Sequence, residues 1–138
     1  ARTVGQKFNP DVVFALDVTI ATDTPGLSKS CKAGNGPAIL LMDSSMIGHR
    51  GLRDFVVSVA EELGIPYQLD YLKRGGTDAG QIHLSHDGAP GMAVCIPARY
   101  IHSHTSIISK SDYFNTIKLL TEVIKRLDEE AYQKILEA

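Results

Sequence analysis

The chain has 138 residues, of which 43% are hydrophobic and 22% charged, which is typical of one globular domain with a real core. Its net charge of −2 does not favour nucleic-acid binding, which needs a basic surface. No apolar run approaches the roughly 20 residues of a membrane span, and we expect no signal peptide. Cys31 and Cys95 are too few for a disulfide framework, so we expect free thiols in a reducing compartment, the cytoplasm.

The first half of the chain contains two apolar runs that predict buried strands. Val12–Leu16 follows a turn signal and ends just before Asp17. Thr24–Pro37 is rich in Gly, Pro, Ser and Thr and is predicted to be a loop. Ala38–Met42 could be a strand or a helix fragment by periodicity alone, and its short length and the preceding Gly-Pro favour a strand.

The middle of the chain continues this alternation of strands and helices. Apolar residues recur at helical spacing over Leu52–Leu63, and Gly64 provides a stop signal. Tyr67–Leu72 alternates apolar and polar residues, which predicts a strand. Met92–Ile96 predicts another strand, which Pro97 is expected to end.

A long amphipathic helix is predicted near the end of the chain. Ser109 and Asp112 have the spacing of a capping box, and an apolar stripe then runs through Ser111–Leu127, with a polar tail beyond it. Strands that alternate with helices predict an α/β fold with a mostly parallel sheet and helices on both faces. Ligands bind beyond the carboxyl ends of the strands in such sheets, so residues at strand ends are candidates for function.

Asp17 follows the first predicted strand. A carboxylate in this position is costly unless something pairs with it. It could cap a turn or helix, or it could be a metal ligand or a catalytic carboxylate, and the local sequence leaves both interpretations open.

The glycine-rich segment Gly75–Gly80 follows the predicted strand Tyr67–Leu72. Its glycines would let the backbone approach a ligand, and Thr77 or Asp78 could cap a short helix that runs through His83. The segment is neither a P-loop nor a dinucleotide-binding fingerprint. A plain turn with a helix cap and a binding loop therefore both remain possible.

His102 and His104 follow the last predicted strand and would face the same way in an extended segment. Imidazole is the commonest metal ligand among side chains, but either histidine could also be a surface residue. His83 and His86 lack the glutamate of a zinc-binding helix and are interpreted as structural or solvent-facing. The three candidate segments each follow a strand, so we expect them to converge at one edge of the sheet.

Five motifs occur in one order along almost the whole chain, and together they are more specific than any one alone. This ordered set resembles the glutamyl aminopeptidase and tetrahedral aminopeptidase family, whose members have often been labelled endoglucanases. The motifs are Ala15-Leu16-Asp17-Val18-Thr19, Asp23-Thr24-Pro25-Gly26, Gly34-Asn35-Gly36-Pro37, Gly75-Gly76-Thr77-Asp78-Ala79-Gly80 and Pro97-Ala98-Arg99-Tyr100-Ile101-His102-Ser103.

The resemblance implies an aminopeptidase with two divalent metal ions, zinc or cobalt, in a phosphorylase/hydrolase-like α/β/α domain. Asp17 would match the ligand of one metal and His102 the ligand of the other. The loop with Gly76, Thr77 and Asp78 would line the substrate side.

The resemblance also implies that residues 1–138 are the C-terminal part of a catalytic domain. The remaining metal ligands, the general-base glutamate and a dimerisation domain would all lie upstream, so the chain alone is expected to be inactive. A homo-oligomer built from dimers, up to a dodecamer, is implied as well. Two other interpretations stay open: a non-catalytic assembly module, and a glycosidase of the endoglucanase type, which would need paired carboxylates such as Asp17 and Asp78.

Overall fold

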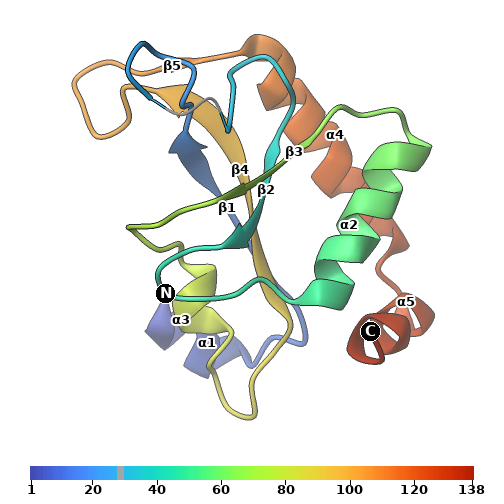
Figure 1. Cartoon of the computed structure of the whole chain (residues 1–138). Helices are drawn as coiled ribbons and strands as arrows, with labels where there is room; N and C mark the ends of the chain where they lie inside the picture. Colours follow the sequence, from blue (N-terminus) through green and yellow to red (C-terminus); the bar gives the residue numbers. More distant parts are fainter. Residues whose placement is uncertain (28–29) are drawn as a thin grey trace.

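The computed structural model describes residues 1–27 and 30–138 of the chain (Figure 1). Within these ranges, no helix is long and apolar enough to cross a membrane. The elements in chain order are α1 (Arg2–Phe8), β1 (Val13–Ile20), β2 (Ala38–Met42), α2 (Arg50–Glu62), β3 (Gln68–Tyr71), α3 (Ala79–Ile82), β4 (Gly91–Arg99), β5 (Ile107–Ile108), α4 (Lys110–Arg126) and α5 (Glu129–Leu136).

The strands form one mixed sheet in the order β1-β4-β2-β3, and the short β5 pairs with β4. β1 runs parallel to β4, and β2 runs parallel to β3, but β2 is antiparallel to β4. The antiparallel pairing covers only two residue pairs. This brief contact lets β3 cross β1 and β4 at a steep angle, as Figure 1 shows.

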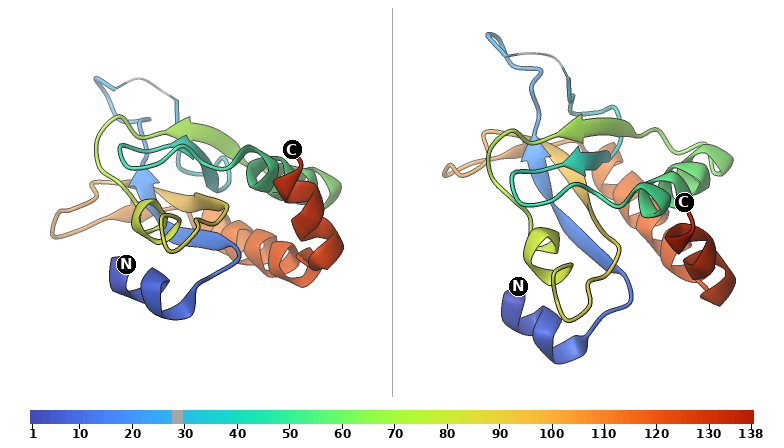
Figure 2. Two further views of the ribbon diagram at one scale, coloured as in Figure 1. Left: turned by 90° about the horizontal axis from the view of Figure 1, so that it is seen from below. Right: turned by 60° about the horizontal axis from the view of Figure 1, so that its bottom comes forward.

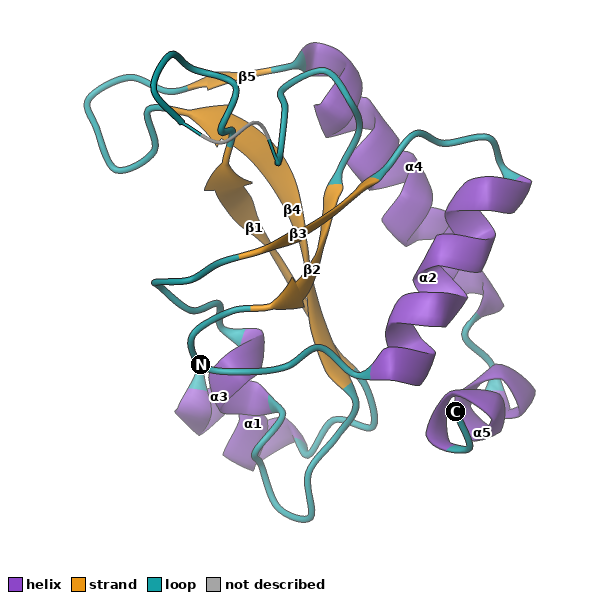
Figure 3. Cartoon of the chain, viewed as in Figure 1, coloured by secondary structure: helices purple, strands orange, loops and turns teal. Residues whose placement is uncertain are grey.

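Helices cover both faces of the sheet, which confirms the predicted α/β fold (Figure 3). α2, α4 and α5 lie on one face, and α1 and α3 lie on the other (Figure 2). Neighbouring residues of β4 point to opposite faces. Val94 therefore joins the core with Leu52 and Leu119, whereas Cys95 joins the core with Ala79.

Several predicted elements are confirmed, while others end elsewhere. β2 has the predicted bounds, and α2 and β3 lie within two residues of theirs. The predicted end of the first strand was wrong, because β1 continues to Ile20 and includes Asp17, which lies opposite Cys95 in the parallel register. Beyond Asp17, the β-branched residues Val18 and Ile20 extend the strand. α1 and β5 were not predicted.

β4 passes through Pro97 to Arg99, so the expectation that Pro97 ends the strand was also wrong. Val13 N donates to Pro90 O and Ala21 N donates to Ala98 O, so even-numbered residues of β4 face β1. The nitrogen of Pro97 therefore points away from β1. The pairing of β2 with β4 stops at Cys95. A residue that lacks an N–H can occupy this position without losing a hydrogen bond of the ladder.

The polar tail predicted after the long helix is instead the helix α5. Asp128 caps it by accepting a hydrogen bond from Ala131 N at 2.9 Å, and Ile135 is buried in the core. The predicted capping box was wrong as well. Ser109 makes no side-chain hydrogen bond to the helix backbone and instead shares one with Ser111 Oγ at 2.7 Å, and the carboxylate of Asp112 is turned toward the backbone of Gly34 and Gly36.

Candidate metal and substrate site

Asp17 lies on β1, a strand at the edge of the sheet, and its side chain is exposed. Because odd-numbered residues of β1 bond to β4, the N–H of Val18 points toward the open edge. Asp17 Oδ1 accepts a hydrogen bond from this N–H at 2.7 Å. No other residue that the structure describes donates to the carboxylate, so most of its lone pairs are available to a ligand.

Asp17 lies opposite Cys95 in the pairing of β1 with β4, and its charge affects the pKa of the Cys95 thiol. Burial raises the pKa of the Cys95 thiol to about 12, and the carboxylates of Asp17 and Asp43 add to the rise. The two carboxylates are therefore close enough to Cys95 for their charges to act on the same thiol. Burial likewise raises the pKa of Cys31 to about 12. Both thiols are free, as predicted, and neither is positioned as an exposed metal ligand.

Asp43, which follows β2, anchors the glycine-rich loop. Its Oδ2 accepts from the backbone N of Thr77 at 2.8 Å and from Thr77 Oγ1 at 2.9 Å. Its Oδ1 accepts from the backbone N of Ser45 at 2.7 Å and from Ser45 Oγ at 2.6 Å. Burial acts to raise the pKa of Asp43, but these hydrogen bonds outweigh it and the pKa is lowered. Asp43 is therefore a buried, charged anchor.

Asp43 was not among the predicted site residues, although the sequence around it contains a signal. A carboxylate directly after the apolar run Ala38–Met42 needs donors, and a serine two residues later is typical of an Asx-turn. The partner Thr77 is 34 residues away along the chain, so spacing could not reveal it.

The three residues predicted to face the substrate occupy different environments. Thr77 is buried and its hydroxyl donates to Asp43, whereas Gly76 and Asp78 are exposed. A Cβ on Gly76 would come within 2.6 Å of Ser45 Oγ, so a larger residue would displace the Ser45 side chain that hydrogen-bonds to Asp43. Asp78 precedes α3 but makes no side-chain cap hydrogen bond, which leaves its carboxylate free at the surface.

His102 lies in the loop that follows β4. Both His102 and His104 are exposed. His102 has a left-handed backbone with φ of 57°, and Tyr100 has φ of 61°. Such conformations are uncommon for residues other than glycine, so this loop is held in a specific shape. No residue that the structure describes hydrogen-bonds to the His102 ring. The rings of His83 and His86, which were not predicted to bind metal, hydrogen-bond to backbone carbonyls.

Two contacts bring together the segments that follow β1, β3 and β4. A cavity of about 310 Å³ lies between the end of β1, with Ile20 and Thr22, and the end of β3, with Arg74 directly before Gly75. The ion pair of Asp23 and Arg99 joins the segment after β1 to the end of β4. The segment after β1 therefore contacts the end of β4 and the start of the segment after β3. The glycine-rich loop then leads into α3, which packs beside the starts of β1 and β4, since a Cβ on Gly91 would lie 2.9 Å from His83 Cβ and 3.6 Å from Val13 Cβ. The expectation that all three segments converge at one edge of the sheet was therefore wrong for this loop.

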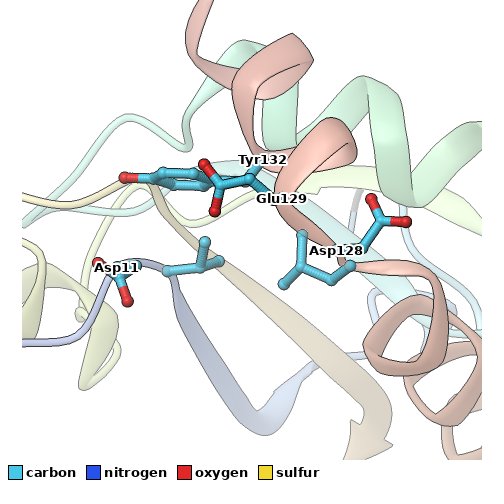
Figure 4. Close-up of a pocket in the computed structure, with 6 residues that line it drawn as sticks. Asp11, Asp128, Glu129 and Tyr132 are labelled. Carbon is cyan, nitrogen blue, oxygen red and sulfur yellow. The ribbon is translucent and has the colours of Figure 1, made fainter.

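A second cavity of about 450 Å³ lies near the start of β1 and the start of α5, and Figure 4 shows the side chains that line it. None of the predicted site residues contributes to it. It is therefore separate from the candidate site. The lining residues are Asp11, Val12, Leu127, Asp128, Glu129 and Tyr132.

Asp17 and His102 each have the chemistry of a single metal ligand. Asp17 and His102 both present exposed side chains whose donor atoms are largely unused by the described residues. Across residues 1–27 and 30–138, however, no cluster of three His, Cys, Asp or Glu side chains is arranged to hold a metal ion. A catalytic zinc site usually takes three ligands from protein. Further ligands would therefore have to come from elsewhere.

Comparison with known proteins places the chain in a family. The model of the M42 glutamyl aminopeptidase family matches residues 1–119. The glutamyl aminopeptidase of Lactococcus lactis subsp. cremoris is 34% identical over 135 residues, which are 98% of this chain but 38% of the relative. The chain thus spans well under half of this relative.

Solved structures give the same result. A TET aminopeptidase from a marine sediment archaeon of the Thaumarchaeota has a TM-score of 0.94 and 42% identity, over 97% of this chain and 38% of that chain. The Pyrococcus horikoshii TET1 peptidase, which can assemble into a tetrahedron or a large octahedral shell, has a TM-score of 0.72 and 29% identity, over 89% of this chain and 35% of that chain. This chain belongs to the M42 glutamyl aminopeptidase family.

Proposed function

We propose that this chain is the C-terminal part of the catalytic domain of a metal-dependent aminopeptidase, which releases N-terminal residues from peptides. The observation that carries the proposal is the family match over residues 1–119, which includes all five sequence motifs. Within the proposed enzyme, Asp17 binds one divalent metal ion and His102 binds the other. Gly76, Thr77 and Asp78 line the substrate side.

Two bound zinc or cobalt ions would polarise the scissile carbonyl and lower the pKa of a coordinated water. The residues of this chain would hold the metal ions and orient the substrate. The N–H of Val18 fixes one oxygen of Asp17 and leaves the other free to bind. Asp43 holds Thr77 inward, so that the exposed Gly76 and Asp78 form the surface of the loop. The general base is a glutamate outside this chain.

The open edge of β1 supports the proposal that more protein completes the domain. Among the residues that the structure describes, no strand pairs with this edge. Leu16, Val18 and Ile20 lie there with exposed fractions of 59%, 42% and 41%. An exposed apolar edge strand is a liability that folded proteins cover. We propose that the upstream remainder of the enzyme covers it and supplies the missing metal ligands.

We further propose a homo-oligomer built from dimers, up to a dodecamer, because the Pyrococcus horikoshii TET1 peptidase can assemble into a tetrahedron or a large octahedral shell. The free, buried thiols favour a cytoplasmic location.

A chelator experiment tests the proposed activity. The complete enzyme, which contains this chain and the upstream remainder, is assayed with a chromogenic aminoacyl substrate and with a soluble cellulose substrate. We expect aminopeptidase activity that a chelator abolishes and added zinc or cobalt restores. Cellulose hydrolysis that survives the chelator would instead support the glycosidase. Absence of both activities from an assembled, metal-loaded particle would support the assembly module.

A further inference from the structure

Asp23 and Arg99 form a two-point ion pair at the end of the sheet where β1 and β4 stop. Arg99 Nε donates to Asp23 Oδ1 at 2.9 Å, and Arg99 Nη2 donates to Asp23 Oδ2 at 2.7 Å. The hydrogen bond from Arg99 lowers the pKa of Asp23, so the pair is ionised at neutral pH. The planar guanidinium fork matches the carboxylate and fixes their mutual orientation.

The Asp23 side of the pair is itself anchored. Ala21 N donates to Ala98 O at 2.9 Å, which extends the pairing of β1 with β4 by one residue. Thr22 N donates to Cys31 O at 2.8 Å, and Cys31 N donates to Thr22 Oγ1 at 3.0 Å. Because Cys31 is buried, the backbone next to Asp23 is a fixed point.

The Arg99 side leads directly into the loop with His102. Arg99 is the last residue of β4 and lies three positions before His102. On its return, the loop is closed by the pairing of Arg99 with Ile107 in β5. Within it, Ser103 Oγ lies 2.6 Å from the carbonyl oxygens of both Tyr100 and Thr105, and its single hydrogen serves them in turn or together.

Left-handed backbone at Tyr100 and His102 needs such support. Conformations of this kind persist only where the surroundings over-determine them, and they concentrate at functional sites. The ion pair fixes where the loop starts, β5 fixes where it ends, and Ser103 fixes its middle. Of these, the ion pair is the one that reaches the segment directly after β1, the strand that carries Asp17.

We propose that the Asp23–Arg99 pair is a positioning device that holds the loop after β4 so that the His102 imidazole is presented in one orientation relative to β1. The metal-binding part of this inference rests on the proposed function. The effect on the loop does not, because it can be measured without metal. The matched control is the pair of Arg126 and Glu62, joined at 2.7 Å between α4 and α2.

The experiment compares Asp23→Asn, Arg99→Gln and Arg99→Lys with the control Glu62→Gln. Hydrogen exchange is measured on the metal-free complete enzyme, and cobalt binding is measured on the same protein. We expect faster exchange over residues 100–106 in Asp23→Asn and Arg99→Gln but not in the control, and cobalt affinity about tenfold weaker. Arg99→Lys keeps the charge but loses the fork, so an intermediate effect is expected.

Several results would overturn the inference. Exchange over residues 100–106 that equals the parent's in both Asp23→Asn and Arg99→Gln would show that the loop does not need the pair. Faster exchange confined to β1 and β4 would show that the pair only fastens the strand ends. If Arg99→Gln fails to fold, Arg99→Lys decides by the same criterion. Weaker cobalt binding in His102→Ala with unchanged binding in Asp23→Asn would refute the positioning role and leave the proposed function standing. Unchanged binding in His102→Ala would refute the ligand assignment instead.

Discussion

Both carboxylate oxygens of Asp43 are fully used, and one of them holds Thr77 by its backbone N at 2.8 Å and by its hydroxyl at 2.9 Å. The glycine-rich loop is thus fixed from beneath by a buried anion, and its other face is left to the surface. This relationship explains why a threonine stands in the middle of the loop. The Thr77 hydroxyl has a structural role, because it donates to Asp43.

Asp43→Asn is expected to destabilise the chain by about 2 kcal/mol, because an amide cannot accept four hydrogen bonds and turns an N–H₂ group toward two donors. The measurement is denaturant unfolding at pH 7. Asp87→Asn is the matched control, since Asp87 is exposed. Equal stability of both variants would contradict the anchoring role.

The same comparison has a defined pH dependence. The pKa of Asp43 is lowered in the folded state from its ordinary value of 3.8, so its charge stabilises the fold above that pH. The stability gap between the parent and Asp43→Asn is expected to be constant near neutrality and to shrink as pH falls below about 4 through the folded-state pKa. Unfolding curves at a series of pH values measure this. A gap that widens on acidification would refute the charged anchor.

Asp112 and Ser109 are expected to differ strongly, although their spacing suggests one capping box. Asp112 is buried and accepts from Gly34 N at 2.7 Å and Gly36 N at 2.8 Å. Asp112→Ala therefore leaves two N–H groups without acceptors and should cost about 2–4 kcal/mol. Ser109→Ala removes only an exposed hydrogen bond to Ser111 Oγ and no bond to the helix backbone, so it should cost under about 0.5 kcal/mol. Thermal and denaturant unfolding of the two variants provide the test, and a larger loss for Ser109→Ala would restore the capping box.

Both thiols are expected to be unreactive in the folded chain. Burial raises the pKa of Cys31 and of Cys95 to about 12, so about one thiol in ten thousand is ionised at pH 8. A thiol reagent should therefore label neither residue in buffer and both in denaturant. Rapid labelling of Cys31 or Cys95 under native conditions would show that the core on that face of the sheet opens readily.

The sequence predicted those elements whose pattern is local. The apolar run of β2 is continuous, and the apolar residues of α2 recur at helical spacing. Both elements were therefore predicted nearly in full. β1 was cut short because Asp17 interrupts its apolar run, and an edge strand tolerates a charge that a central strand would not. α5 has only 8 residues, so its apolar pattern is short. Asp128 can be identified as its N-cap only once the structure shows where the helix begins.

The candidate site, like the fold, was predicted only where the signal is local in the sequence. Asp17, His102 and the glycine-rich loop were found from motifs, whose order along the chain is a one-dimensional property. Asp43 with Thr77, and Asp23 with Arg99, are pairs separated by 34 and 76 residues. The parallel pairing of β2 with β3 brings the first pair together, and the parallel pairing of β1 with β4 brings the second pair together.

The two histidines of the last loop are expected to be unequal. His102→Ala should lower metal content in the complete enzyme, whereas His104→Ala should have a much smaller effect. The reason is that His102 occupies the motif position and that its backbone is held at φ of 57°, while His104 has no such constraint. Metal analysis of both variants decides between them. A loss in His104→Ala as large as in His102→Ala would show that the wrong histidine was assigned.

The central claim is that this chain gives one ligand to each of two metal ions. Its most direct test is the metal content of the purified complete enzyme, measured by mass spectrometry beside peptidase activity, for the parent, Asp17→Asn and His102→Ala. We expect each variant to lose about one of the two metal ions per subunit, together with its peptidase activity. Two ions retained with full activity in either variant would contradict the claim.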